Sequence, residues 1–385
     1  MSRLTFSDEQ RQFRDFVARF FREQSPVTAA RAIMMGESGF DPELWRRLGG
    51  ELGLTGVHVP EAFGGQGFGA VELGIVLEEM GRVAYCGPYF GSAVLATYAL
   101  LEGATAAQQE RWLPPLAAGD IIGSLALAEP GGGWEADAVQ ASARSSSGRW
   151  RLQGTKSYVL DGPIANLFIV AAREPGSAGS DGVSLFAVQA DAPGLEVEPL
   201  QTMDATRRLS RLRLSGVDAE LLGEPGAAAP VLRRVIDRAA VALASEMVGG
   251  AQALLDSAVS YAKLRLQFGR LIGSFQAIKH KCADMLLAVE LAKSAAYGAA
   301  EMAALGADAD EFPEAAALAK TLAAEAFLQA AADTIQIHGG IGFTWENDTH
   351  LYFKRARSSE VLLGTPAEFR DRFVERVSAR EVAYE

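Results

Sequence analysis

The segment RWRLQGTKSYVL at 149–160, followed by NLFIVAA at 166–172 and VSLFAVQA at 183–190, decides the fold. These segments are short, they often alternate apolar with polar residues, and they are separated by turn-forming stretches such as EPGSAGSDG at 174–182. Further segments of this kind, SLALAE, LEVEPL and RLSRLRLSG, lie between positions 121 and 222. Six or more short strands at this spacing favour an antiparallel sandwich or barrel over a parallel sheet.

The pattern becomes helical on both sides of this region. A capping box of Ser7 and Gln10 precedes the first stretch with helical periodicity, and helices continue to about residue 118. From about residue 226 the chain is helical again, with an Ala-rich third helix suited to close packing in a bundle or a subunit interface. We therefore predict an α+β protein with a helical N-terminal domain (1–118), a middle antiparallel β domain (119–224) and a C-terminal four-helix bundle (225–385).

Composition argues against several classes of protein. The formal net charge of −12 disfavours nucleic acid and anionic membranes as partners, because both require a basic surface. The two cysteines lie far apart and only four histidines are present, so neither a disulfide framework nor a multi-His metal site is expected. The sequence has no apolar signal core at its start and no run of about 18 apolar residues, so we expect a cytoplasmic protein.

Four motifs follow one another along the chain. They are VPEAFGG at 59–65, AEPG at 128–131, Arg265-x-x-Phe268-Gly269 followed by Gln276, and GGIGFTWE at 339–346 preceded by Gln336. Together they resemble the acyl-CoA dehydrogenase family over essentially the whole chain, and in particular a divergent branch that includes heteromeric steroid side-chain acyl-CoA dehydrogenases. One such motif alone is a weak signal, whereas four in the right order at the right separations are a strong one.

The resemblance implies that the protein binds FAD. A Gly-rich turn beside a helix end offers free backbone N–H groups to a pyrophosphate, and the planar fork of Arg265 pairs with phosphate oxygens. A plain interhelical turn and a surface salt bridge are the alternatives for these two features. The resemblance implies the following cofactor-binding residues: Arg265, Phe268, Gln276, Gln336, Gly339, Gly340, Leu127, Ala128, Tyr158 and Thr365. In the family some of these groups reach FAD across a subunit interface, which implies an oligomer.

The catalytic base is missing from the two positions where the family usually has it. Most members carry it as the Glu of a Glu-Gly-Thr near the C-terminus, where this chain has Leu363. A second known position lies near the start of the long helix after the β domain, where this chain has Ala239. Two turns further along the same helical face, Glu246 is the only charge between Arg238 and Asp256.

Glu246 is therefore the candidate catalytic base. An isolated carboxylate on an apolar helix is costly to bury in its ionised form, which makes it a stronger proton acceptor. The arrangement resembles family members that act on bulky substrates, including steroid side-chain thioesters. The alternative is a structural role for Glu246 within the bundle or at a subunit contact. Glu360 and Asp161 are weaker candidates because each lies nearer an expected surface turn.

The resemblance implies FAD-dependent α,β-dehydrogenation of an acyl-CoA thioester, with electrons passing to an electron-transfer flavoprotein. It also implies a homo- or hetero-oligomer, a dimer or tetramer, in which a paralogous subunit is one possible partner. Loss of both usual bases, and of the threonines that face the flavin in the family, leaves open a non-catalytic partner subunit. A flavin oxidase or monooxygenase on the same fold is a further alternative.

Overall fold

A computed structural model describes residues 6–36, 38–305 and 311–383 and divides the chain into two compact units. The first comprises the described residues within Met1–Ala32, Ala70–Tyr85 and Ala240–Glu385, and the second comprises those within Ile33–Gly69 and Cys86–Ala239. Among the described residues, no helix has the length and apolar character needed to cross a membrane.

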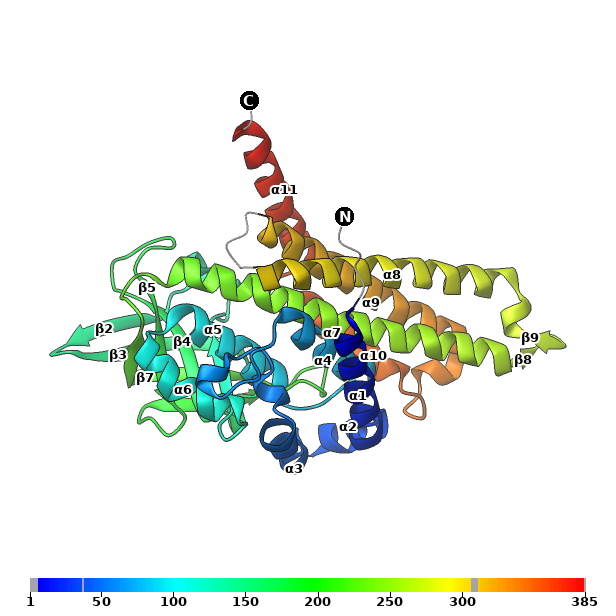
Figure 1. The fold of residues 1–385 in the computed structure, drawn as a ribbon, viewed down its shortest axis with the longest axis horizontal. Coiled ribbons are helices and arrows are strands. Elements are labelled where there is room, and N and C mark those ends of the chain that lie inside the picture. Colours follow the sequence, from blue (N-terminus) through cyan, green and yellow to red (C-terminus); the bar gives the residue numbers. More distant parts are fainter. Residues whose placement is uncertain (1–5, 37, 306–310, 384–385) are drawn as a thin grey trace. The chain divides into compact units, whose positions relative to one another are not determined.

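The first unit is helical, as predicted for the two ends of the chain (Figure 1). Its helices are α1 (Asp8–Gln24), α4 (Ala70–Arg82), most of α7 (Ala228–Leu264), α8 (Gln276–Leu305), α9 (Phe312–His338), α10 (Thr349–Val361) and α11 (Pro366–Ala383). The short hairpin of β8 (Leu266–Gln267) and β9 (Arg270–Leu271) joins α7 to α8. The predicted capping box is confirmed, since Ser7 and Gln10 exchange side-chain and backbone hydrogen bonds at the start of α1.

Glycines allow α4 and α7 to pack backbone against backbone. A Cβ added at Gly81 would lie 2.0 Å from the carbonyl oxygen of Glu246, and one added at Gly249 would lie 1.8 Å from that of Glu78. At Gly250 an added Cβ would meet the ring of Phe327 on α9 at 2.5 Å. Any side chain at these positions would force the helices apart. The small residues around Glu246 thus serve close helix packing.

The second unit is built on the predicted β domain. Its strands are β1 (Gly123–Ala126), β2 (Ser142–Ser146), β3 (Arg149–Leu160), β4 (Leu167–Arg173), β5 (Val183–Gln189), β6 (Leu195–Leu200) and β7 (Leu209–Leu222). They form one seven-stranded sheet in the order β1-β4-β2-β3-β7-β5, with β6 beside β7. Because β5 also pairs with β4, the sheet closes on itself as a barrel.

The barrel is mainly antiparallel, as the strand spacing predicted, although β1 runs parallel to β4. The strand β2 was not among the predicted segments. Short helices complete this unit, namely α3 (Pro42–Arg46), α5 (Thr97–Gly103) and α6 (Ala106–Ala117), while α2 (Val27–Met35) runs from the first unit into the second. The fold class is therefore confirmed, with helical ends around a β middle.

Candidate active site

Glu246 lies on α7 in the first unit with only 7% of its surface exposed. Its Oε1 atom accepts a hydrogen bond of 2.7 Å from Nη1 of Arg355 on α10, and the two side chains form a buried ion pair. Nη2 of the same guanidinium donates to the backbone oxygen of Tyr85 at 2.8 Å. The expectation that Glu246 is an isolated carboxylate was therefore wrong, because its partner comes from 109 residues further along the chain.

The helical pattern of α10 shows that Arg355 lies on a buried face, although it does not identify the residue that pairs with it. The buried residues of α10 include Leu351, Arg355 and Ser359, which are spaced four apart and therefore share one face. A charged residue in the buried row of a helix requires a partner, and for Arg355 the fold supplies Glu246 from a distant part of the chain.

Leu363, at the place where the resemblance implied the usual base, lies in the turn between α10 and α11. Leu363 is almost fully buried and has a φ of +68°, a strained conformation for a branched residue. Thr365 then begins α11 in a capping box, because its backbone N–H donates to Oε2 of Glu368 at 2.6 Å and its hydroxyl accepts from the Glu368 N–H at 3.3 Å. The cofactor role predicted for Thr365 stays a prediction.

The two weaker base candidates occupy different surroundings. Glu360 lies at the end of α10 and is paired with Arg357 at 2.7 Å, near the surface turn that we expected. Asp161 is buried, so its expected place near a surface turn was wrong. A Cβ added at Gly91 would lie 3.1 Å from Oδ2 of Asp161, which shows how closely this carboxylate is packed.

Six of the predicted cofactor-binding residues gather at one end of the first unit. Arg265 and Phe268 lie on the β8–β9 connection, where Phe268 is 90% exposed, and Gln276 is the first residue of α8. The other three, Gln336, Gly339 and Gly340, lie at the end of α9 and are also exposed. Contacts hold these two places together: the rings of Tyr261 and His338 stack at 4.2 Å, and Lys281 pairs with Asp333.

These residues fit a phosphate-bearing cofactor such as FAD. Arg265 is exposed, and no hydrogen bond or ion pair occupies its guanidinium within the described residues. Gly339 has a φ of +65°, which favours glycine, whereas a Cβ added at Gly340 would meet nothing within 4 Å. The packing of the described chain therefore leaves the backbone at Gly340 open to close approach by another molecule.

The remaining predicted residues, Leu127, Ala128 and Tyr158, lie together in the second unit. The N–H of Ser157, next to Tyr158, donates to the carbonyl oxygen of Ala128 at 2.9 Å. Fully buried Lys156 donates to the Leu127 carbonyl at 3.0 Å and to the carboxylate of Glu129 at 2.7 Å. Lys156 was not among the predicted site residues, although it stands at an inward position of the alternating strand β3.

Burial governs the charge of Lys156. Desolvation lowers the pKa of this ammonium to about 8, against the opposing effect of Glu129. Glu129 also accepts hydrogen bonds from the backbone N–H groups of Gln140 and Ala141, at 2.9 and 2.8 Å. The carboxylate and the ammonium together fix the backbone of the AEPG motif to the strand that carries Tyr158.

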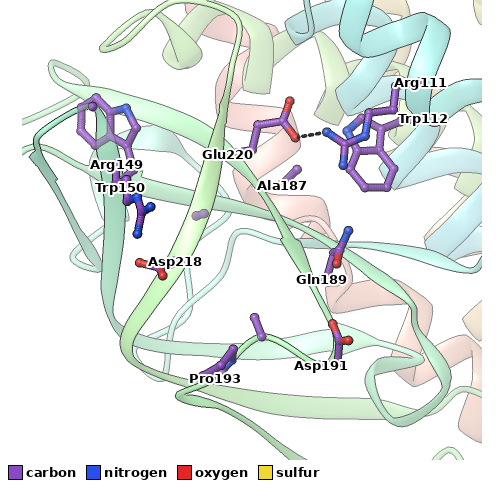
Figure 2. A pocket seen from close by; sticks show the side chains of 13 residues that line it. Arg111, Trp112, Arg149, Trp150, Ala187, Gln189, Asp191, Pro193, Asp218 and Glu220 are labelled. Atoms are coloured by element: carbon purple, nitrogen blue, oxygen red, sulfur yellow. Dashed lines mark hydrogen bonds and ion pairs between the residues drawn. The ribbon is translucent and has the colours of Figure 1, made fainter.

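A separate hollow of about 530 Å³ opens on the second unit (Figure 2). Trp112 and Trp150 lie on its walls, and Arg111 forms an ion pair with Glu220 across one side at 3.0 Å. Asp218, also in its lining, is paired with Arg151 at 3.2 Å. Much of the charge around the hollow is thus already neutralised, and none of the predicted site residues lines it.

Comparison with known proteins agrees with the order of the four motifs. Family models of the acyl-CoA dehydrogenase N-terminal, middle and C-terminal domains match residues 7–120, 124–217 and 229–377. The chain belongs to the acyl-CoA dehydrogenase family. It is therefore a flavoprotein oxidoreductase of lipid metabolism, as the motifs predicted.

Individual relatives resemble this acyl-CoA dehydrogenase along nearly its whole length. Acyl-CoA dehydrogenase IpdE2 of Mycobacterium tuberculosis is 35% identical over 365 residues, covering 95% of this chain and 96% of the relative. A variant of the Tcur3481-Tcur3483 steroid ACAD has a TM-score of 0.86 and 33% identity, covering 97% of this chain and 99% of that one. The ChsE4-ChsE5 complex from Mycobacterium tuberculosis has a TM-score of 0.87 and 28% identity, covering 98% of this chain and 99% of that one.

Proposed function

We propose that this acyl-CoA dehydrogenase catalyses FAD-dependent α,β-dehydrogenation of an acyl-CoA thioester, with Glu246 as the base that accepts the α-proton. The observation that carries the proposal is the buried Glu246 carboxylate, which Arg355 holds in an ion pair at 2.7 Å. A nearby guanidinium favours the ionised form of a carboxylate, and only the ionised form can accept a proton. No other position that the family uses for the base carries a carboxylate in this chain.

The chemistry of the family assigns different roles to FAD and to the protein chain. FAD, when bound, supplies the acceptor for the β-hydride. The chain has to bind the thioester, place its α-carbon within reach of Glu246, exclude water and receive the proton on a carboxylate oxygen. Burial of Glu246 supports the exclusion of water, because it removes the carboxylate from competing solvent hydrogen bonds.

The cofactor would be held by the two groups of residues described above. We assign the phosphate and adenine side to the exposed cluster of Arg265, Phe268, Gln276, Gln336, Gly339 and Gly340. The isoalloxazine side falls to Leu127, Ala128 and Tyr158 in the second unit, where the residues at 127 and 128 offer backbone groups and no hydroxyl. Thr365, in the first unit, keeps the cofactor contact that the resemblance implies. The proposal retains the three domains at 1–118, 119–224 and 225–385.

An oligomer with a second subunit completes the proposal. Large apolar side chains are exposed on α8 and beside it in the first unit, and an exposed apolar surface of this kind is typical of a protein interface. They are Leu264, Leu266, Phe268, Leu286, Leu287 and Leu291. The two similar solved structures are each named after a pair of proteins, and one is a steroid ACAD. We therefore propose a paralogous partner, a bulky or steroid-derived acyl chain, and an electron-transfer flavoprotein as electron acceptor.

The same ion pair also supports a second candidate function. A buried Glu–Arg pair can be purely structural, since removing one partner leaves the other charge buried and uncompensated. In that case this chain would be a non-catalytic partner that completes a site on a related subunit. The loss of both usual bases favours this alternative, and the two candidates differ in what Glu246 does.

Substitution Glu246→Gln separates the two candidates. The amide keeps the shape of the side chain and removes its proton affinity, so flavin reduction by a thioester should slow by about 10²–10⁴. Rapid mixing of the anaerobic, flavin-loaded assembly with acyl-CoA measures this rate from flavin absorbance. Glu110→Gln, at an exposed carboxylate of α6, is the matched control and should keep the parental rate. A stable, fully flavinylated Glu246→Gln protein that reduces flavin normally would favour the partner-subunit function.

A further inference from the structure

Three basic residues lie close together on α10, and only one of them is turned into the unit. Lys354 lies over the ring of Trp345, with its ammonium 5.0 Å from the ring centroid. Arg357 is exposed and pairs with Glu360. Arg355 is 6% exposed and reaches Glu246. A buried guanidinium is costly unless its hydrogen-bond donors are satisfied, so its presence here calls for a specific explanation.

Two of the contacts of Arg355 differ in character. The contact with Glu246 depends on the charge of that carboxylate, whereas the contact with the Tyr85 carbonyl oxygen, 2.8 Å away, does not change with protonation. Nη1 donates to Glu246 and Nη2 donates to Tyr85. Because the guanidinium is planar and rigid, the directions of these two hydrogen bonds are fixed relative to each other. The Tyr85 carbonyl therefore still anchors the guanidinium after Glu246 has taken up a proton.

The two contacts also determine where the carboxylate points. Glu246 belongs to α7, whose backbone is packed directly against α4 at Gly81, and Tyr85 follows the end of α4. Arg355 thus links the Glu246 side chain on α7 to Tyr85, which follows α4, the helix against which α7 is packed. Bonding at Oε1 restricts the rotation of a flexible side chain, and such restriction is the usual source of catalytic orientation.

We propose that Arg355 is a positioning residue for proton transfer at Glu246, holding the carboxylate ionised and oriented before transfer and keeping its own anchor at Tyr85 afterwards. The inference rests on the proposed function, because it requires Glu246 to be the base. It assigns to α10 a new contribution, a cation eight residues before the turn where the family usually carries the base. In the proposed step the thioester Cα–H and Cβ–H bonds break, the α-proton forms an O–H bond with Glu246, and the electron pair of the Cα–H bond forms the Cα=Cβ double bond. Bound FAD would supply the two-electron acceptor for the β-hydride.

Two substitutions of Arg355 test the proposal through the rate of flavin reduction at saturating thioester. Arg355→Met keeps the length of the side chain and removes its charge, and we expect the rate to fall by about 10², the typical cost of misplacing a catalytic group. Arg355→Lys keeps the charge and should recover part of the rate. The apparent dissociation constant of the thioester should change little in both variants. Arg357→Met, at the exposed neighbour, is the matched control and should behave like the parent.

A charge exchange distinguishes positioning from stability. The double variant Glu246→Arg with Arg355→Glu restores an ion pair, so it should melt closer to the parent than either single variant does. A positioning role predicts that this protein remains slow, because the carboxylate now starts from α10. Recovery of both melting temperature and rate would show that only the ion pair matters and would overturn the proposal.

Two outcomes tell this inference apart from the proposed function. If Glu246→Gln abolishes flavin reduction while folded Arg355→Met reduces flavin at the parental rate, the base assignment stands and the role of Arg355 is refuted. If Glu246→Gln itself reduces flavin normally, the base assignment fails and the role of Arg355 fails with it. Should Arg355→Met not fold, the comparison of Arg355→Lys with the charge-exchanged protein gives the same decision.

Discussion

His58 should make this protein sensitive to mild acid, and removing it should relieve part of that sensitivity. Its ring is 8% exposed and lies 4.7 Å from the ring of Tyr98 on α5. Neither ring nitrogen has a hydrogen-bond partner within the described residues. Burial, and then the nearby Arg238 guanidinium, lower the pKa of His58 to about 3. The folded protein therefore keeps this imidazole neutral.

The size of this acid sensitivity follows from the difference in the pKa of His58 between the folded and the unfolded chain. The ordinary pKa of histidine is 6.5, so between pH 6.5 and about 3 the unfolded chain binds a proton that the folded chain does not. The free energy of unfolding must therefore fall as the pH falls through this window, by about 1.4 kcal/mol per pH unit. At about pH 4.5 the loss is roughly 3 kcal/mol, a large share of a typical stability of about 5–15 kcal/mol.

Substitution His58→Phe keeps a ring against Tyr98 and removes the titrating group. Urea unfolding followed by tryptophan fluorescence at about pH 7 and about pH 4.5 gives the stability lost on acidification for each protein. This loss should be roughly 3 kcal/mol smaller in His58→Phe than in the parent. Using the difference between two pH values cancels any packing change that the larger ring causes. His280→Phe, at an exposed histidine, is the control and should lose as much stability as the parent.

Equal losses in the parent and in His58→Phe would refute the reasoning. Such a result would mean that the folded protein protonates His58 as readily as the unfolded chain does. The ring would then need an acceptor or a path to solvent, and the buried contact with Tyr98 and Arg238 would not hold in solution.

Two further predictions concern the cofactor and the assembly. Arg265→Ala should weaken FAD binding by about tenfold to a hundredfold, because a charge-assisted contact contributes roughly 1.5–3 kcal/mol. Flavin titration measures the change, Lys263→Ala at an exposed neighbour is the control, and unchanged binding would make Arg265 an ordinary surface residue. Native gel filtration should give an oligomer, and a yellow species at the monomer mass of 40.9 kDa would contradict the interface proposal.

Features with a local cause could be predicted from the sequence. The capping box at Ser7 needs only residues three positions apart, and α7 begins at Ala228, close to the predicted return of helical structure at about residue 226. Strands β3 to β6 follow the alternating segments between their turn signals. The strand β2 has three serines among its five residues and lacks the β-branched or aromatic pattern that signals a strand. The strand β2 therefore forms because it pairs with β3, and the composition of β2 alone does not predict a strand.

Partners that come from distant parts of the chain could not be predicted. Glu246 looked isolated because the sequence shows only neighbours on its own helix, whereas Arg355 is brought to it by the packing of α7 and α10. Lys156 and Glu129 are 27 residues apart, and the barrel brings them to 2.7 Å. Both pairs consist of buried opposite charges. Sequence patterns can show that a charge falls on a buried face, but the fold chooses the residue that neutralises it.

The turn at Leu363 shows how this chain could lose the usual base without losing the local structure. A left-handed backbone costs about 1–2 kcal/mol for a non-glycine residue, and full burial of a leucine side chain returns about 1.5–3 kcal/mol. Lys320, fully buried on α9, donates to the carbonyl oxygens of Ser359 and Glu360 at the end of α10. Burial of Leu363, this cap and the capping box at Thr365 can therefore keep the turn in shape with no carboxylate present. In the proposed function the base is Glu246 on α7, so the turn at Leu363 needs only to orient α11. Arg355 on α10 then holds the Glu246 carboxylate.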